Sequence, residues 1–147
     1  MYPFKSILVP VDFAESSEQA LDLAIDVARR YEASLTLLHC YEIPSYAYGG
    51  MSFVGADLLG PVEEAAREQL ERELGKVRQR LPAAKAILRR GVPWTEILSG
   101  IEEQKPDLVV MGTHGRRGLS RALLGSVAER IVRMSPVPVL IVRGVGQ

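Results

Sequence analysis

The stretch LVVMGTHGRRGLSRALLGSVAERIVR, residues Leu108–Arg133, decides how this chain folds. It opens with the apolar run Leu108–Met111, which is typical of a buried parallel strand. The chain then turns polar and glycine-rich, and after residue 125 its apolar positions recur at helical spacing. The glycines are Gly112, Gly115, Gly118 and Gly125. The pattern predicts a strand that leads into a loop, and a loop that leads into the amino end of a helix.

The loop has the composition of an anion-binding site. Arg116, Arg117 and Arg121 place positive charge between the glycines. Ser126, followed by Glu129 three residues later, predicts a capping box that opens the helix. The amino end of a helix has unpaired N–H groups and about half a unit of positive charge, which suits phosphate. The spacing matches neither the G-x-G-x-x-G fingerprint nor the Walker P-loop, so a long glycine-rich surface turn is the alternative interpretation.

Composition sets the class of protein. The chain has 147 residues, and we expect residues 1–147 to form a single domain with a sizeable core. Its 18 basic and 18 acidic side chains cancel, which argues against nucleic acid or an anionic membrane as a partner. A single cysteine, Cys40, fits a reducing compartment. No signal segment opens the sequence, and no apolar run approaches the roughly 20 residues that span a bilayer, so we expect a cytoplasmic location.

Short apolar runs alternate with helical periods along the chain. Strands are predicted at residues 7–11, 34–40, 85–90, 108–111 and 137–142, and helices at residues 16–31, 61–81 and 93–104 and from residue 126 onward. This alternation predicts an α/β fold, a three-layer, doubly wound, five-stranded parallel sheet. Ser16 with Gln19 predicts a capping box for the first helix. Residues 43–60 have no clear period and are interpreted as a surface linker, or alternatively as a lid or partner surface.

Two segments carry a family resemblance. They are KSILVPVDFAESSEQAL, residues Lys5–Leu21, and MGTHGRRGLSRALLGSVAERIVRMSPVPVLIVR, residues Met111–Arg143. They resemble the first strand and helix, and the nucleotide-binding loop and last strand, of the universal stress protein family in its nucleotide-binding, UspA-like form. The glycine spacing, the serine that follows it and both proline-valine motifs match in order. The resemblance covers nearly the whole chain and implies a Rossmann-like sheet with strand order 3-2-1-4-5.

That order would place the ends of the first and fourth strands side by side, where ligands bind in open parallel sheets. The resemblance then implies that an adenine nucleotide, ATP in the first instance, binds there with Mg²⁺ or Mn²⁺ held mainly through the phosphates. The candidate nucleotide-binding residues are Pro10, Val11, Asp12, Cys40, Met111, Gly112, His114, Gly115, Arg116, Gly125, Ser126 and Val127.

The resemblance also assigns the two ends of the nucleotide. Phosphates are expected on Gly115, Gly125 and Ser126, and adenine and ribose beside the end of the first strand, with Cys40 against the base. Other roles stay open for single residues. Asp12 can instead cap the following turn, and Cys40 is interpreted as a packing residue rather than a reactive thiol.

The two histidines, His39 and His114, lack metal-ligand spacing, so a structural zinc site is not expected. His114 lies within the glycine loop. It can contact phosphate there, or it can simply be an exposed loop residue. The sequence alone leaves both interpretations open.

The last predicted strand contains Pro138, which argues for an edge position because proline cannot donate to a neighbouring strand. An exposed apolar edge favours pairing with another chain. The resemblance implies antiparallel pairing with a second copy across a two-fold axis, and hence a homodimer. The residues expected at this interface are Val137, Val139, Leu140, Ile141 and Val142.

The sequence lacks the motifs of common hydrolases. It has no G-x-S-x-G elbow, no HExxH motif and no general base beside an evident nucleophile. We therefore expect ATP binding with a regulatory or stress-response role as a homodimer, rather than efficient turnover. A slow ATPase switch and a nucleotide-free dimeric interaction module are the alternatives.

Overall fold

The computed structural model describes residues 3–43, 52–113 and 124–144, and only the backbone of residues 52–58. Strands and helices alternate along it, as predicted. In chain order they are β1 (Ser6–Pro10), α1 (Glu15–Tyr31), β2 (Ser34–Tyr41), α2 (Ser52–Arg78), β3 (Lys85–Arg90), α3 (Pro93–Gln104), β4 (Leu108–Gly112), α4 (Ser126–Met134) and β5 (Val139–Val142).

All five strands form one parallel sheet in the order β3-β2-β1-β4-β5. β1 lies at the centre, where Ile7 pairs with Leu35 of β2 on one side and with Leu108 of β4 on the other. The predicted fold class and strand order are therefore confirmed. The order reverses between β1 and β4, because β2 and β3 lie on one side of β1 while β4 and β5 lie on the other.

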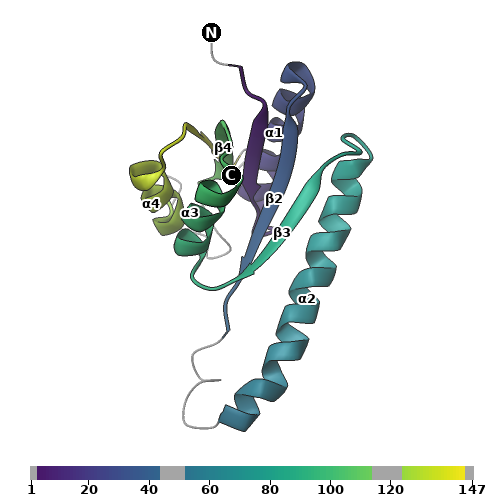
Figure 1. Ribbon diagram of the computed structural model, residues 1–147, viewed down its shortest axis with the longest axis vertical. Coiled ribbons are helices and arrows are strands. Elements are labelled where there is room, and N and C mark those ends of the chain that lie inside the picture. Colours follow the sequence, from purple (N-terminus) through teal and green to yellow (C-terminus); the bar gives the residue numbers. More distant parts are fainter. Residues whose placement is uncertain (1–2, 44–51, 114–123, 145–147) are drawn as a thin grey trace.

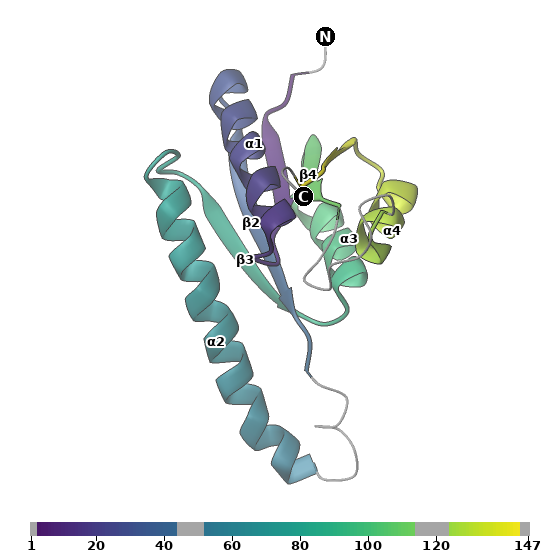
Figure 2. The same cartoon turned by 180° about the vertical axis from the view of Figure 1, so that it is seen from behind.

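The helices cover both faces of the sheet (Figures 1 and 2). On one face, alternate strand residues such as Val9 and Val110 pack with Ala24 of α1 and Leu70 of α2. On the other face, Leu8, Val109 and Met111 pack with Ile97 and Ile101 of α3 and Ala128 and Ile131 of α4. The central strands β1 and β4 are covered on both faces and bury nearly all of their side chains, which explains their nearly continuous apolar runs. No helix in the described part of the chain is long and apolar enough to span a bilayer.

Both predicted capping boxes are wrong by one or two positions. The N-cap of α1 is Ala14, and that of α4 is Gly125, so Ser16 and Ser126 lie inside the first turn. The turn before α1 is stabilised instead by Asp12, whose Oδ1 accepts a hydrogen bond from the Ala14 N–H at 3.0 Å. Acidic residues are also favourable within a first turn, so the same sequence pattern can lie one or two positions further into the helix.

The long second helix also differs from the prediction. It begins at Ser52 rather than at Pro61, and Pro61 lies inside it. Proline can occupy the start of a helix but does not show that the helix starts there. Residues 52–60, predicted as part of a linker or lid, are therefore helical, whereas residues 44–51 lie outside the described residues. In Figure 1 the amino-terminal part of α2 extends past the carboxyl edge of the sheet.

The final strand occupies the predicted edge of the sheet, next to β4. It begins at Val139 rather than Val137, and Pro138 lies just before it, where its carbonyl accepts a hydrogen bond from the Val109 N–H at 2.9 Å. Because only the carbonyl is used, the missing N–H of the proline costs no pairing.

Gly112, the last residue of β4, lies against the start of α1. A Cβ atom added there would lie 2.6 Å from the Ser16 Oγ and 2.7 Å from the Ser16 carbonyl carbon. The Ser16 side chain can rotate away from such a Cβ atom, but the backbone carbon and oxygen of Ser16 cannot. The glycine thus allows α1 to approach β4, a packing role in addition to the ligand approach that the sequence suggested.

We therefore expect Gly112→Ala to lower the free energy of unfolding by about 1–3 kcal/mol, the usual cost of forcing an extra carbon into a packed interior. Urea denaturation followed by circular dichroism measures this change. Gly75→Ala is the matched control, because nothing lies within 4 Å of a Cβ at Gly75 in α2. Alanine in that helix should leave stability unchanged or raise it by up to about 1 kcal/mol. Equal stability of both variants would contradict the packing role of Gly112.

Candidate functional site

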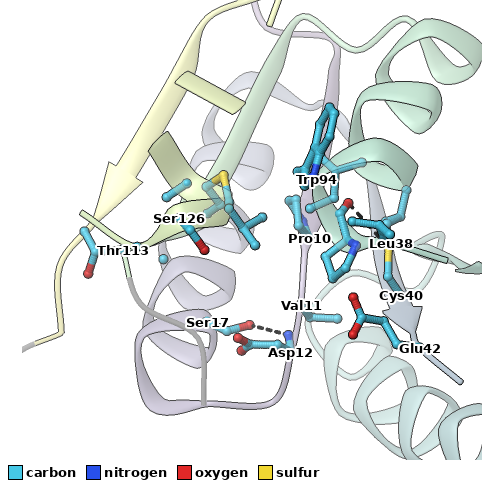
Figure 3. Close-up of a pocket in the computed structure, with 18 residues that line it drawn as sticks. Pro10, Val11, Asp12, Ser17, Leu38, Cys40, Glu42, Trp94, Thr113 and Ser126 are labelled. Carbon is cyan, nitrogen blue, oxygen red and sulfur yellow. Dashed lines mark hydrogen bonds between the residues drawn. The ribbon is translucent and has the colours of Figure 1, made fainter. Parts of the chain in front are cut away.

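A pocket of about 760 Å³ opens beside the carboxyl ends of β1, β2 and β4 (Figure 3). It lies at the reversal of strand order, where the chain leaves β1 toward α1 on one face of the sheet and leaves β4 toward α4 on the other. The lining residues are Pro10, Val11, Asp12, Ser17, Leu38, Cys40, Glu42, Val92, Pro93, Trp94, Ile97, Met111, Gly112, Thr113, Gly125, Ser126, Val127 and Ala128. Its volume is within the range of small-molecule sites.

Every predicted nucleotide-binding residue that the structure describes lines this one pocket. They are Pro10, Val11, Asp12, Cys40, Met111, Gly112, Gly125, Ser126 and Val127. Three further residues predicted for the same role, His114, Gly115 and Arg116, lie outside the described residues. The fold thus brings together segments that are about a hundred positions apart in the sequence, and their role in binding stays a prediction.

Asp12 is held in place by the turn that joins β1 to α1. Its backbone N–H donates to the Ser17 Oγ at 3.1 Å, and its Oδ1 accepts from the Ala14 N–H at 3.0 Å. The residue that follows, Phe13, has a φ of 66°, in the left-handed region that bulky side chains rarely adopt. Asp12 does cap this turn, which was the alternative role that the sequence left open, and it also lines the pocket. The two roles are compatible because a carboxylate has several acceptor positions.

The amino end of α4 forms another part of the wall. Gly125 is extended, with φ −62° and ψ 155°, and its N–H donates to the Thr113 carbonyl at 2.8 Å. No side chain of the N-cap bonds the helix start. The first helical residues, Ser126 and Val127, have N–H groups without an intrahelical acceptor. These groups lie where Ser126 and Val127 line the pocket, so this wall offers donors and a partial positive charge to an anion.

The charged side chains of the described lining are both acidic. Asp12 follows β1 and Glu42 follows β2, and Figure 3 shows them at the same end of the pocket on either side of Val11. None of the described lining residues is a lysine or an arginine. An anion bound there therefore needs compensating charge from the start of α4, from a cation or from the rest of the chain.

Apolar side chains form the remaining walls. Pro10, Val11 and Leu38 come from the ends of β1 and β2, and Trp94 from the first turn of α3. The guanidinium carbon of Arg130, on α4, lies 4.5 Å from the centre of the Trp94 ring, so a cation–π contact joins α3 to α4 beside the pocket. Such a surface suits the flat, weakly polar faces of a base.

Cys40 is partly buried among these side chains. Its Sγ lies 4.0 Å from the carbonyl oxygen of Pro93. Burial, together with the negative charge of Glu96, raises the pKa of the Cys40 thiol to about 12, although Arg89 acts in the opposite direction. The thiol is therefore neutral near pH 7, as expected for a packing residue rather than a nucleophile.

Several lining residues were missed by the sequence analysis. Ser17 and Glu42 lie close to predicted site residues, and the rule that ligands bind at strand ends could have indicated them. Val92, Pro93 and Trp94 are different, because they follow β3 at the far edge of the sheet. They reach the pocket only because α3 packs back across β2 and β1 on the same face as α4. No local sequence signal carries that information.

The universal stress protein family model matches residues 3–143 of this chain. The chain belongs to the universal stress protein family. A universal stress protein of Methanocaldococcus jannaschii is 33% identical over 144 residues, covering 95% of this chain and 82% of that protein. The solved structure of the universal stress protein UspA from Lactobacillus plantarum matches with a TM-score of 0.83 at 26% identity, covering 95% of this chain and 98% of that one. The family predicted from the two sequence segments is thereby confirmed.

Two further solved structures share the fold and contain adenine nucleotides. One is a universal stress protein in complex with cAMP, with a TM-score of 0.70 and 23% identity, covering 97% of this chain and 99% of that one. The other is a universal stress protein family protein from Arabidopsis thaliana with AMP bound, with a TM-score of 0.62 and 19% identity, covering 95% of this chain and 91% of that one. At these identities the comparison shows a common fold.

The raised pKa of Cys40 leads to a direct prediction about its reactivity. At pH 8 the folded thiol should be alkylated by iodoacetamide at least about a hundredfold more slowly than glutathione, because only the thiolate reacts. Mass spectrometry can follow the single adduct, since Cys40 is the only cysteine in the chain. Protein unfolded in urea is the control and should react at the ordinary rate. Alkylation of the folded protein within tenfold of glutathione would show that the thiol is not shielded.

Proposed function

We propose that this pocket binds an adenine nucleotide, ATP in the first instance, and that occupancy regulates the protein in a stress-response role. The observation that carries the proposal is the meeting of the Asp12 turn and the start of α4 in one pocket at the reversal of strand order. Open parallel sheets bind ligands at this position. Two proteins of the same fold, solved with cAMP and with AMP, support the choice of an adenine nucleotide.

The two kinds of wall suggest the orientation of the nucleotide. Its phosphates would accept hydrogen bonds from the N–H groups at the start of α4, beside Gly125 and Ser126. Gly115, Arg116 and His114, which lie outside the described residues, remain proposed phosphate contacts. The base would lie against the apolar side chains near Pro10, with ribose between the two ends. Asp12 is placed to accept a hydrogen bond from a ribose hydroxyl or to help hold a cation.

A divalent cation fits the donors that line the pocket. Asp12, Ser17, Thr113 and Ser126 offer a carboxylate and hydroxyl oxygens, which are ligands for Mg²⁺ or Mn²⁺. The described residues contain no group of three or more histidine, cysteine or acidic residues able to hold a metal by themselves. We therefore propose that the ion arrives with the triphosphate and neutralises part of its charge in this acidic pocket.

We propose that the protein binds the nucleotide rather than turning it over efficiently.

We also propose a cytoplasmic location, because the free thiol of Cys40 in the pocket wall suits a reducing compartment.

Two measurements test the proposal. Isothermal titration calorimetry measures the heat of binding as ATP and Mg²⁺ are added, and thermal unfolding measures the change in melting temperature. Free nucleotide at a hundred times its dissociation constant should raise stability by about 2.7 kcal/mol, a shift of a few degrees. Asp12→Ala should weaken binding about 10- to 100-fold, the range for loss of a charged hydrogen bond. Gly125→Asp should weaken it further, because it places a carboxylate beside the phosphates.

Asp26→Ala is the matched control for these variants. Asp26 forms an exposed ion pair with Arg30 on α1, and its loss should leave nucleotide affinity unchanged. Release of inorganic phosphate from the same samples distinguishes hydrolysis from binding. No thermal shift in the unaltered protein, or equal affinity in all three variants, would refute nucleotide binding at this site.

We also propose that the chain forms a homodimer through β5. This strand is a sheet edge, Leu140 on it is 37% exposed, and an apolar edge strand favours pairing with another copy. The interface would be completed by Val137, Val139, Ile141 and Val142.

Leu140→Lys should weaken the dimer, because it places a charge on this apolar edge. Sedimentation velocity across a dilution series measures the change. Leu23→Lys on α1, where the leucine is equally exposed at 37%, should have no effect. A sedimentation profile that Leu140→Lys leaves unchanged would rule out this interface.

A further inference from the structure

We propose that His39 is a positioning residue that holds Asp12 in the conformation in which it lines the pocket. This inference rests on the proposed nucleotide site, and it concerns a side chain that is not part of the pocket wall. Leu38 and Cys40 of β2 line the pocket, and His39 between them points to the opposite face of the sheet. Any effect of His39 on a ligand must therefore pass through another residue.

The imidazole bonds the chain where β1 leaves the sheet. The β1–β2 pairing ends at Pro10 and Leu38, and the Val11 N–H still donates to the Leu38 carbonyl at 2.8 Å. The Nδ1 of His39 lies 2.8 Å from the Val11 carbonyl oxygen. A carbonyl oxygen only accepts, so Nδ1 carries the proton and donates it. His39 is only 8% exposed, which limits competition from water for this bond.

The same ring contacts the residue on the other side of Asp12. The centres of the Phe13 and His39 rings lie 4.4 Å apart, with their planes tilted by 49°. Phe13 has a φ of 66°, a left-handed conformation that is disfavoured for a bulky side chain and needs support from its surroundings. His39 thus contacts both neighbours of Asp12, by a hydrogen bond to Val11 and by ring packing on Phe13.

The turn is also bonded to the start of α1 and to its N-cap, Ala14. Ser17 accepts from the Asp12 N–H and the Ala14 N–H donates to the Asp12 carboxylate, and these bonds fix Asp12 relative to the helix. His39 fixes the same turn relative to the sheet, and the pocket is built on the ends of the sheet strands. Displacement of a binding group by about 1 Å can cost a large factor in a site that depends on orientation.

The test compares His39→Leu with His39→Asn. The Asn side-chain amide can place its N–H₂ close to the position of Nδ1 and keep the donor to Val11, whereas leucine removes it. His39→Leu should weaken ATP about tenfold, and His39→Asn should restore affinity to within about threefold of the unaltered protein. In an Asp12→Ala background, His39→Leu should change affinity less than about twofold, because coupled residues are not additive.

Tyr41→Phe is the control for general loss of stability. Tyr41 is a buried residue of the same strand, and its hydroxyl donates to Glu63 of α2 at 2.9 Å. Loss of the Tyr41 hydroxyl should lower the melting temperature without changing ATP affinity. Equal weakening by His39→Leu with and without Asp12, or no rescue by asparagine, would overturn the positioning role.

A second readout needs no nucleotide. The backbone chemical shifts and the coupling between the amide and α protons of Phe13 report its left-handed φ in the free protein. This signature should be present in the unaltered protein and in His39→Asn and be lost in His39→Leu, or in His39→Gln if the leucine variant does not fold. A signature retained without the donor would overturn the inference even if ATP binds. If the Phe13 chemical shifts behave as expected but ATP does not bind, only the proposed nucleotide site is refuted.

Discussion

The parallel pairing of β1 with β4 is the constraint on which the rest of the structure depends. It places β1 between β2 and β4 and reverses the strand order at the centre of the sheet. The chain leaves β1 for α1 on one face and leaves β4 for α4 on the other. Connections that diverge to opposite faces cannot fill the space between them, and the pocket lies there.

Close packing at this junction brings polar groups to the pocket. Gly112 lets the first turn of α1 lie against β4, and Ser17 in that turn bonds the backbone of Asp12. Gly125 bonds the Thr113 carbonyl and leaves the start of α4 without a side-chain cap. A helix start whose N-cap residue makes no side-chain hydrogen bond is suited to a bound anion. Packing and the proposed binding chemistry therefore depend on the same few positions.

The sequence predicted what depends on local pattern. Apolar runs and helical periods indicated the strands and helices. The strand order that the family resemblance implied, together with the rule for strand ends, placed Asp12 and Gly112 at one crevice. The sequence mislocated features that several neighbouring residues can satisfy. It placed the cap of α4 at Ser126 rather than at Gly125, and the start of α2 at Pro61 rather than at Ser52. It missed Trp94, because its approach to the pocket depends on how α3 packs on the sheet and on α4. A local sequence pattern does not predict contacts of this kind, which depend on tertiary packing.

The central claim is that an adenine nucleotide lies across the ends of β1 and β4 with its phosphates on the start of α4. A crystal structure with a non-hydrolysable ATP analogue and Mg²⁺ tests this most directly. We expect phosphate oxygens within hydrogen-bond distance of the Ser126 N–H, with the base against Pro10 and Cys40. A nucleotide bound elsewhere on the protein, or no nucleotide at saturating concentration, would contradict it.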